Sequence, residues 1–434
     1  MTDCDVLVVG AGPAGLGAAV AAKARGARVI VLERGPSVGG LAGGFSFAGG
    51  TLDLGPHFLE SRFGDAAGVR DLLEEVPYVE DIQLRGRRCR FPLGLLREPR
   101  YVVSVGTGAL RSLRPPSAEA PSLADHLRRA YGRAFAAEVL EPLIAKWSGR
   151  PCGELSADLA ERFDPPSPRI VLHHAKVLLT RRSHHLSGDR VVWTRGKGGI
   201  GRVMEAIAAR QRLDVRTGCE VTAIDLDTAT ITLAGGARLS ARALVATQPW
   251  PVLARLCPDP RLAPFAALPH RAIVLLYLLI DRARVLGNQW TWFPAAEVPF
   301  YRASEPTNCG PVAGLPAGKA AIVLELATAA DDATFCADDA SLVEEGWRAF
   351  RALHELPAHA LCQGAVLRAR FGYPVYAREQ RHLRRRLEAP VHPRLLVAGR
   401  FGLHRHIQSE ASYETGRTAG DAASALPIAE RASS

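Results

Sequence analysis

Three glycines near the amino terminus, Gly10, Gly12 and Gly15, have the spacing that brings a polypeptide backbone against a pyrophosphate. The first permits a tight turn, the second lets the backbone approach the phosphates, and the third lets a helix pack closely on a sheet. The N–H groups and positive dipole end at the start of that helix then favour the anion. Glu33 would accept hydrogen bonds from a ribose and disfavours a 2′-phosphorylated cofactor. The pattern predicts dinucleotide binding by Gly10, Gly12, Pro13, Ala14, Gly15, Glu33 and Arg34.

The elements that must position these residues are visible in the hydrophobic pattern. An apolar, β-rich run at 5–9 is followed by the glycines, an alanine-rich helix pattern to about residue 25, and a second strand pattern at 27–33. This order is a βαβ unit of the Rossmann type. The further patterns predict strands at 213–215, 221–226, 243–246, 272–280 and 395–398, and helices over 123–145 and from about residue 410.

Two later glycine turns extend the motif. Gly39-Gly40-Leu41 follows the second strand, Asp53-Leu-Gly55-Pro56-His57 comes next, and Gly399-Arg400 precedes the last helix. This order resembles that of the large glutathione-reductase-like class of flavoproteins, and the resemblance implies FAD as the cofactor. The further FAD-binding residues that it implies are Gly39, Gly40, Leu41, His57, Val221, Gly399, Arg400, Ser409 and Glu410.

Over nearly its whole length the chain resembles the branch that contains UDP-galactopyranose mutase, protoporphyrinogen oxidase, and the phytoene desaturase and amine oxidase flavoenzymes. The resemblance rests on Gly39-Gly40, Asp53 to His57, Tyr131-Gly132, Glu141-Pro142, Lys146-Trp147, Glu154 to Asp158, Lys197 to Gly201, Val298 to Arg302, Tyr373 to Tyr376, and Gly399 to Glu410. The elements at Lys146-Trp147, Pro299 to Arg302 and Tyr373-Pro374 are the narrowest and favour the mutase.

The resemblance to the mutase also implies a substrate site. Arginines would hold a substrate anion through their planar, permanently charged fork, at positions matched by Arg190, Arg302 and Arg405. The implied catalytic residues are His57, Arg302, His404 and Arg405, and the implied substrate-binding residues are Trp147, Arg190, Arg302, Tyr373 and His406.

The chain departs from the mutase pattern at several of these positions. His404 and His406 replace tyrosines beside Arg405, Lys146-Trp147 has no residue between lysine and tryptophan, and Gln408-Ser409-Glu410 replaces an acidic element. The substrate is therefore not expected to be UDP-galactopyranose itself. The two histidines could titrate near neutral pH and serve acid–base chemistry, or they could be hydrogen-bonded structural residues, and the sequence leaves both interpretations open.

Composition limits the partners. The 434 residues carry a net charge of +10, which favours anionic ligands, but no motif for nucleic-acid binding accompanies it. The eight scattered cysteines contain no C-x-x-C pair and indicate reduced thiols, so we expect a cytoplasmic protein. No apolar stretch is long enough to predict a membrane span. The pairs His173-His174 and His184-His185 lack a third ligand at suitable spacing, so no metal is expected.

We therefore predict an α/β fold: a Rossmann-type, glutathione-reductase-like FAD-binding domain with an inserted substrate domain of antiparallel sheet plus helices. The expected segments are FAD-binding at 1–75, a helical insert at 76–188, FAD-binding at 189–255, an antiparallel-sheet substrate domain at 256–385, and FAD-binding with a tail at 386–434. The predicted function is hydride transfer between flavin N5 and a small anionic or sugar-like molecule, such as a sugar, sugar nucleotide or specialised metabolite. The alternatives are a non-redox sugar-nucleotide mutase that uses reduced FAD, a lipid- or polyisoprenoid-processing flavoenzyme, and a flavin-binding protein without catalysis. The sequence does not predict an oligomeric state.

Overall fold

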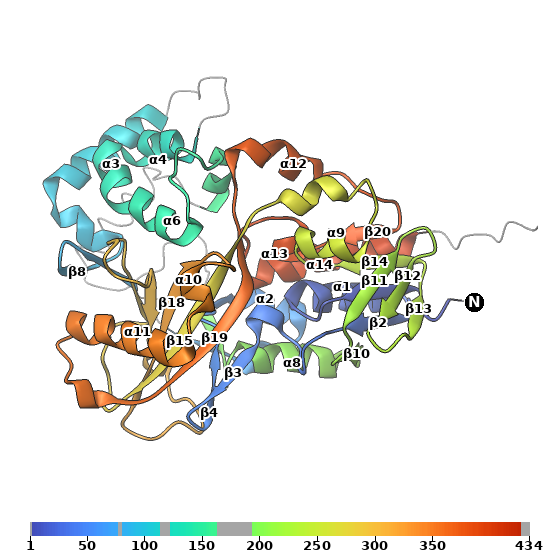
Figure 1. Ribbon diagram of the computed structural model, residues 1–434, viewed down its shortest axis with the longest axis horizontal. Helices are drawn as coiled ribbons and strands as arrows, with labels where there is room; N and C mark the ends of the chain where they lie inside the picture. The colour runs from blue at the N-terminus through green and yellow to red at the C-terminus, as the bar shows by residue number, and fades with distance from the viewer. Residues whose placement is uncertain (1, 77–79, 113–121, 163–192, 427–434) are drawn as a thin grey trace, which may run out of the picture.

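The computed structural model describes residues 2–76, 80–112, 122–162 and 193–426 (Figure 1). Its first sheet is built of five parallel strands that come from the start, the middle and the end of the chain. They lie in the order β10 (Asp214–Arg216), β2 (Val29–Leu32), β1 (Val6–Val9), β14 (Ala243–Ala246) and β20 (Leu395–Val397). This parallel sheet, in which β1 and β2 are joined by a crossover helix, confirms the predicted Rossmann-type domain.

Both faces of this sheet are buried, as expected for parallel strands. Val6 and Val8 face the helices α1 (Pro13–Ala24) and α14 (Ser409–Ala425). Leu7 and Val9 face α9 (Trp250–Leu256) and a small antiparallel sheet. That sheet consists of β11 (Val221–Asp225), β12 (Thr230–Leu233) and β13 (Arg238–Ser240). Because alternate side chains point to opposite faces and both faces are buried, these strands appear in the sequence as continuous apolar runs.

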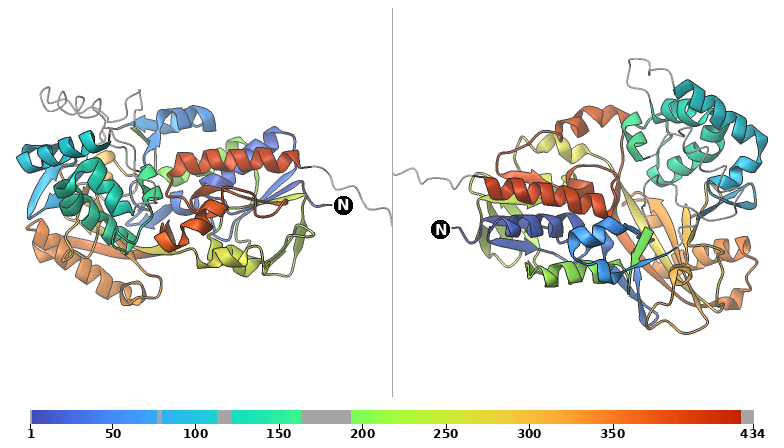
Figure 2. Two further views of the ribbon diagram at one scale, coloured as in Figure 1. Left: turned by 90° about the horizontal axis from the view of Figure 1, so that it is seen from above. Right: turned by 180° about the vertical axis from the view of Figure 1, so that it is seen from behind.

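The last helix lies directly against the first, which explains why residues so far apart in the sequence form one domain (Figure 2). Glycines permit the contact: a Cβ atom at Gly416 would lie 1.9 Å from the Ala14 carbonyl oxygen. A Cβ atom at Gly420 would lie 2.1 Å from the Ala18 carbonyl oxygen. Any larger residue at these positions would push α14 away from α1.

A seven-stranded sheet forms the second lobe. Its strand order is β19 (Leu361–Pro374), β15 (His270–Ile280), β18 (Ala320–Thr328), β17 (Arg302–Ser304), β16 (Trp290–Trp292), β7 (Glu80–Leu84) and β8 (Arg87–Arg90). All neighbours are antiparallel except β16 and β7. One face of β15 packs against α11 (Asp339–Leu353), and the other packs against a hairpin of β3 (Gly44–Phe47) and β4 (Gly50–Asp53). This sheet confirms the predicted antiparallel substrate domain, although the pattern before residue 99 gives no indication of β7 and β8.

Helices α3 (Pro99–Ser112), α4 (Leu123–Tyr131) and α6 (Glu141–Ser148) form a helical lobe above that sheet (Figure 1). The single helix predicted over 123–145 is wrong. Gly132 has φ +77°, and a Cβ atom there would lie 1.9 Å from the Ser104 carbonyl oxygen, so the chain bends at this close approach to α3. A π-helical turn, Ala136–Leu140, then leads into α6, where Pro142 occupies the first turn and needs no N–H donor.

Shorter elements complete the fold. They are β5 (Leu59–Glu60), α2 (Ser61–Ala67), β6 (Leu73–Glu75), α5 (Arg133–Phe135), β9 (Trp193–Gly196), α8 (Ile200–Arg210), α10 (Ala333–Cys336), α12 (Arg381–Arg386) and α13 (Gly399–Gly402).

Candidate cofactor site and active site

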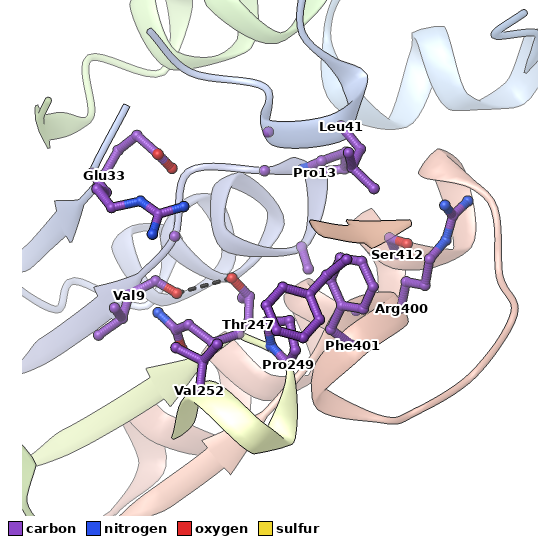
Figure 3. Close-up of a pocket in the computed structure, with 18 of the residues that line it drawn as sticks. Val9, Pro13, Glu33, Leu41, Thr247, Pro249, Val252, Arg400, Phe401 and Ser412 are labelled. Atoms are coloured by element: carbon purple, nitrogen blue, oxygen red, sulfur yellow. Dashed lines mark hydrogen bonds between the residues drawn. The ribbon is translucent and has the colours of Figure 1, made fainter. Parts of the chain in front are cut away.

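An elongated cavity of about 290 Å³ opens at the carboxyl ends of β1, β2 and β14, where ligands bind in folds of this type. Figure 3 shows Glu33 at one end and Arg400 at the other, with Pro13 and Leu41 between them. The lining comes from three parts of the chain: the βαβ unit and its second glycine turn, the segment after β14, and the segment between β20 and α14.

The first glycine turn is built for a backbone that approaches a ligand. Gly10 has φ +99°, and a Cβ atom there would lie 2.2 Å from Thr247 Oγ1, which donates to the Val9 carbonyl at 2.9 Å (Figure 3). A Cβ atom at Gly15 would lie 1.8 Å from the Gly10 carbonyl oxygen. No side chain caps the N-terminus of α1, which lines the cavity. The N–H groups of its first turn therefore have no side-chain acceptor. This donor set fits a pyrophosphate.

Glu33 connects the glycine turn to the loop after β2. One carboxylate oxygen accepts the Ala11 N–H at 2.8 Å, and the other accepts the Gly35 N–H at 2.7 Å. A carboxylate has about four acceptor positions, so the side chain retains capacity for ribose hydroxyls where it lines the cavity. The residue therefore shapes the turn in addition to the predicted role of accepting from the ribose.

The two later glycine turns reach the same place. Gly39, with φ +110°, donates its N–H to the Ala11 carbonyl at 2.9 Å and fixes the second turn beside the first. Gly399, with φ +79°, donates to Thr415 Oγ1 at 3.1 Å. A Cβ atom at Gly399 would lie 2.6 Å from Ala14 Cβ, so only glycine lets this segment approach α1 so closely.

Most of the residues predicted to bind FAD line this cavity. They are Gly10, Gly12, Pro13, Ala14, Glu33, Arg34, Gly40, Leu41, His57, Val221, Gly399, Arg400 and Ser409. Three predicted residues are not part of its lining: Gly15 and Gly39 shape the turns, and Glu410 instead accepts the Glu60 N–H at 2.9 Å. Burial raises the pKa of Glu410 to about 7. A direct contact of Glu410 with the cofactor is therefore not supported.

Sequence reasoning missed a group of lining residues that belong to the segment after β14, to β19, and to α13 and α14. They are Thr247, Gln248, Pro249, Val252, Phe371, Phe401 and Ser412. The position of Thr247-Gln248-Pro249 directly after a parallel strand could have indicated them, because the carboxyl ends of parallel strands meet at one edge.

His57 lies at the Arg400 end of the cavity and belongs to its lining. Its Nδ1 is 3.1 Å from the Gly55 carbonyl, which can only accept, so Nδ1 carries the proton and Nε2 has the lone pair. Burial, together with the charges of Arg400 and Arg302, lowers the pKa of His57 to about 4. His57 is therefore a neutral hydrogen-bond acceptor at neutral pH and a weak base, so its implied catalytic role is not that of a general acid or base.

Arg400 brings a positive charge to this end of the cavity. Its Nε donates to the Ile407 carbonyl at 3.0 Å, and its Nη1 donates to the Gly372 carbonyl at 3.2 Å. The guanidinium lies 5.2 Å from the centroid of the Tyr373 ring. Within the described residues no carboxylate forms an ion pair with Arg400, so its charge is left to be balanced by an anionic ligand.

Four polar residues form a buried group beyond His57, which we call the Glu325 cluster: Tyr301, Arg302, Glu325 and Tyr373. Arg302 donates to both oxygens of Glu325, at 2.6 and 2.7 Å, and Glu325 is 2% exposed. Tyr301 donates to Glu325 at 2.6 Å, and the hydroxyls of Tyr301 and Tyr373 are 3.3 Å apart. Burial raises the pKa of Tyr301 well above its usual value, and the charge of Glu325 adds to this effect. The predicted role of Arg302 as a clamp for a substrate anion is therefore not supported, because Glu325 already balances its charge.

Three aromatic side chains form what we call the aromatic wall: Trp147, Tyr373 and His406. The His406 ring stacks on Tyr373 with centroids 4.7 Å apart and meets the edge of Trp147 at 4.9 Å. Lys146 fixes the helix that carries Trp147 by donating to the carbonyls of Phe293 and Ala295, at 2.8 and 2.6 Å. Burial lowers the pKa of Lys146 to about 8. The structure thus brings together three of the residues predicted to bind substrate.

The remaining predicted residues lie elsewhere. His404 has φ +46°, and its Nε2 is 3.1 Å from the Val375 carbonyl. Burial, with the nearby His270, lowers the pKa of His404 to about 3, so it does not titrate near neutral pH. Arg405 forms an ion pair with Glu161 at 2.9 Å, and its side chain is 43% exposed. Neither residue lines the cavity, so the predicted catalytic roles of His404 and Arg405 are not supported.

Some predictions fall outside the described residues, namely those for Arg190, His173-His174 and His184-His185. In the part of the chain that the structure describes, no group of three histidine, cysteine or acidic side chains is arranged to hold a metal ion.

The sequence model of the family of flavin-containing amine oxidoreductases matches residues 13–423. The chain belongs to that family. Hydroxyneurosporene desaturase of Rhodobacter capsulatus is 46% identical over 75 residues, a stretch that spans 16% of this chain and 15% of that protein. The structure of reduced UDP-galactopyranose mutase superimposes with a TM-score of 0.80 at 22% identity and covers 96% of this chain and 95% of the mutase. A protein of Exiguobacterium sp. 255-15, assigned as a protoporphyrinogen oxidase, superimposes with a TM-score of 0.73 at 17% identity, over 98% and 99% of the two chains.

This flavin-containing amine oxidoreductase is therefore an FAD-dependent enzyme, and its cavity has the backbone turns, helix terminus and arginine that such a cofactor requires. Family membership confirms the predicted cofactor and the prediction of an oxidoreductase, and leaves the substrate open. Among the described helices none is long and apolar enough to cross a membrane.

Proposed function

We propose that this enzyme removes a hydride from a small substrate without a phosphate group, bound between the aromatic wall and the FAD cavity. The observation that carries this proposal is the bidentate ion pair between Arg302 and the buried Glu325. A guanidinium in this arrangement has little attraction left for a substrate pyrophosphate. The sugar-nucleotide mutase alternative needs free arginines at this position and is disfavoured for that reason.

The same charge pattern disfavours a cationic substrate. His57 is neutral and the carboxylate of Glu325 is paired with Arg302, so the described residues at this end of the cavity offer no free counter-charge. A protonated amine would lose its hydration there without gaining an ion pair. A neutral substrate, such as an alcohol, a sugar or an unprotonated amine, meets no such cost.

Bound FAD would accept the hydride; an alcohol or a sugar would release its hydroxyl proton to water, and an unprotonated amine would leave as its iminium ion. The residues of the chain would perform the other tasks. Gly10, Gly12 and the start of α1 would hold the pyrophosphate, and Glu33 the ribose. Arg400 would stabilise negative charge at the reacting end of the cavity, which is a known way in which a protein tunes a bound flavin.

His57 Nε2 and the hydroxyl of Tyr373 would orient the substrate. His57 offers an acceptor, because its Nδ1 proton is engaged by Gly55. Tyr301 donates its proton to Glu325 and therefore accepts from the Tyr373 hydroxyl, which holds that hydroxyl in place. The packed rings of Trp147 and His406 would exclude water from the substrate.

Anaerobic titration of the oxidised holoenzyme tests the proposal. Neutral alcohols, sugars and amines would be compared with nucleotide sugars, while the loss of flavin absorbance is followed. We expect bleaching by a member of the neutral set, with a rate that falls in Tyr373→Phe and not in Tyr131→Phe, a variant on α4 whose residue does not line the cavity. If only nucleotide sugars react, and only the reduced enzyme converts them to isomers, the proposal is wrong and the mutase alternative is correct.

A further inference from the structure

Exposed large hydrophobic side chains gather on one helix. Within the described residues they are Val102, Val103 and Leu110, which are 48%, 65% and 68% exposed, and all three belong to α3. On an α-helix these positions fall within an arc of about 100° and form a single face. Isolated surface hydrophobics are ordinary, but their concentration on one helix face needs an explanation.

The opposite face of α3 is firmly packed, so the exposure does not come from a loose helix. Tyr101 and Ser104 are buried, and Ser104 Oγ accepts the Phe135 N–H at 3.1 Å. A Cβ atom at Gly108 would lie 2.5 Å from the Ala130 carbonyl oxygen, which shows how closely α3 lies on α4. The helix therefore presents its apolar face from a rigid base, at the end of the molecule opposite β13 (Figure 1).

The segment of the chain that contains α3 is rich in basic residues. Residues 85–148 contain twelve basic and five acidic residues, a net charge of +7 within a chain whose total is +10. Arg97 precedes α3, Arg111 lies in its last turn, and both are exposed. In the described part of the chain neither forms an ion pair with a carboxylate. An apolar helix face with an arginine near each end is suited to the surface of a lipid bilayer, which has an apolar interior and anionic headgroups.

We propose that α3 docks the helical lobe on the surface of a membrane that contains anionic phospholipids. Val102, Val103 and Leu110 enter the boundary between headgroups and acyl chains, and Arg97 and Arg111 contact the phosphates. A second copy of this chain is a poorer occupant, because pairing two α3 faces would bring two lobes of like charge together. This proposal does not depend on the identity of the substrate.

The test is co-sedimentation of the FAD-loaded enzyme with vesicles of phosphatidylcholine, with and without phosphatidylglycerol. We expect binding to the anionic vesicles, loss of binding as salt is raised, and about tenfold weaker binding to the neutral vesicles. Val103→Glu/Leu110→Glu should weaken binding to anionic vesicles by about tenfold or more, because it places two carboxylates in the apolar face.

The matched control is Ala24→Glu/Ala340→Glu, which adds the same charge at exposed positions of α1 and α11. It should bind anionic vesicles almost as well as the unmodified enzyme. Flavin absorbance and the thermal midpoint of both variants would show that they are folded.

Two results would overturn the proposal. One is failure of the unmodified enzyme to sediment with anionic vesicles at low salt. The other is equal binding by the α3 variant and the control. Sedimentation velocity without vesicles tests whether a second copy of this chain covers the α3 face. If the enzyme does not bind vesicles but forms a dimer that Val103→Glu/Leu110→Glu dissociates, this face belongs to a second copy instead.

Discussion

The ion pair between Arg302 and Glu325 permits a quantitative test of the substrate argument. Glu325→Gln keeps the shape of the side chain and removes its charge, so one of two strong charge-assisted hydrogen bonds to Arg302 is lost. Arg302 would then remain as an unbalanced guanidinium whose side chain is 13% exposed. Loss of one partner from a buried pair costs about 3–5 kcal/mol, and we expect the free energy of unfolding to fall by that amount.

The double variant Arg302→Met/Glu325→Leu separates the charge effect from general damage. Replacement of both partners by apolar side chains leaves no unbalanced charge. The double variant should therefore be more stable than the summed effects of the single variants Arg302→Met and Glu325→Leu predict. We expect a coupling energy of about 2 kcal/mol or more, partly offset because the Tyr301 hydroxyl keeps only Tyr373 as a partner.

Denaturant unfolding of the holoenzyme, followed by flavin and tryptophan fluorescence, measures these energies. Glu344→Gln, an exposed carboxamide substitution on α11, is the matched control and should change stability by less than about 0.5 kcal/mol. Additive single variants, or a loss of less than about 1 kcal/mol in Glu325→Gln, would show that Arg302 is not committed to Glu325. The argument against a phosphorylated substrate would then lose its basis.

Three further predictions concern the cofactor domain and the half-buried His354. Glu33→Ala should lower FAD occupancy, measured as the ratio of flavin to protein absorbance, because the Ala11 and Gly35 N–H groups lose their acceptor; full occupancy would contradict this role. Gly416→Val should lower both stability and FAD occupancy, since its side chain meets the backbone of α1; an unchanged thermal midpoint would count against that packing. Burial, with the charge of Arg88, lowers the pKa of His354 to about 4 from 6.5, so stability is complete above pH 6.5 and falls as the pH drops towards 4. His354→Gln should reduce that slope by up to about 1.4 kcal/mol per pH unit, and an unchanged slope would refute the shift.

The glycine turns were predictable from the sequence because their function depends on backbone geometry. Gly10 and Gly399 have positive φ and leave no room for a Cβ atom, so the residue type itself indicates the conformation. Burial of both faces of a parallel sheet likewise gives continuous apolar runs that reveal β1 and β14.

The roles of the charged residues were not predictable, because they depend on which partner the fold places opposite each one. The sequence shows Arg302, but its pairing with Glu325 arises from the register between β17 and β18. His404 and Arg405 are neighbours in sequence, yet one is buried beside Val375 and the other forms an exposed ion pair. Neither residue lines the cofactor cavity, although the two adjacent positions match the same motif in the sequence.

Charge balance also limits what the likeness to UDP-galactopyranose mutase means for this enzyme. At the His57 end of the cavity a low pKa keeps the histidine neutral, and Glu325 neutralises Arg302. The charge left unbalanced there belongs to Arg400, which lines the cofactor cavity. A positive charge in that position stabilises the cofactor more than it stabilises a substrate, because FAD brings its own negative charge to the same cavity. The likeness to the mutase therefore concerns the fold, whereas in our proposal the pairing of Arg302 with Glu325 limits the substrates to molecules without a phosphate group.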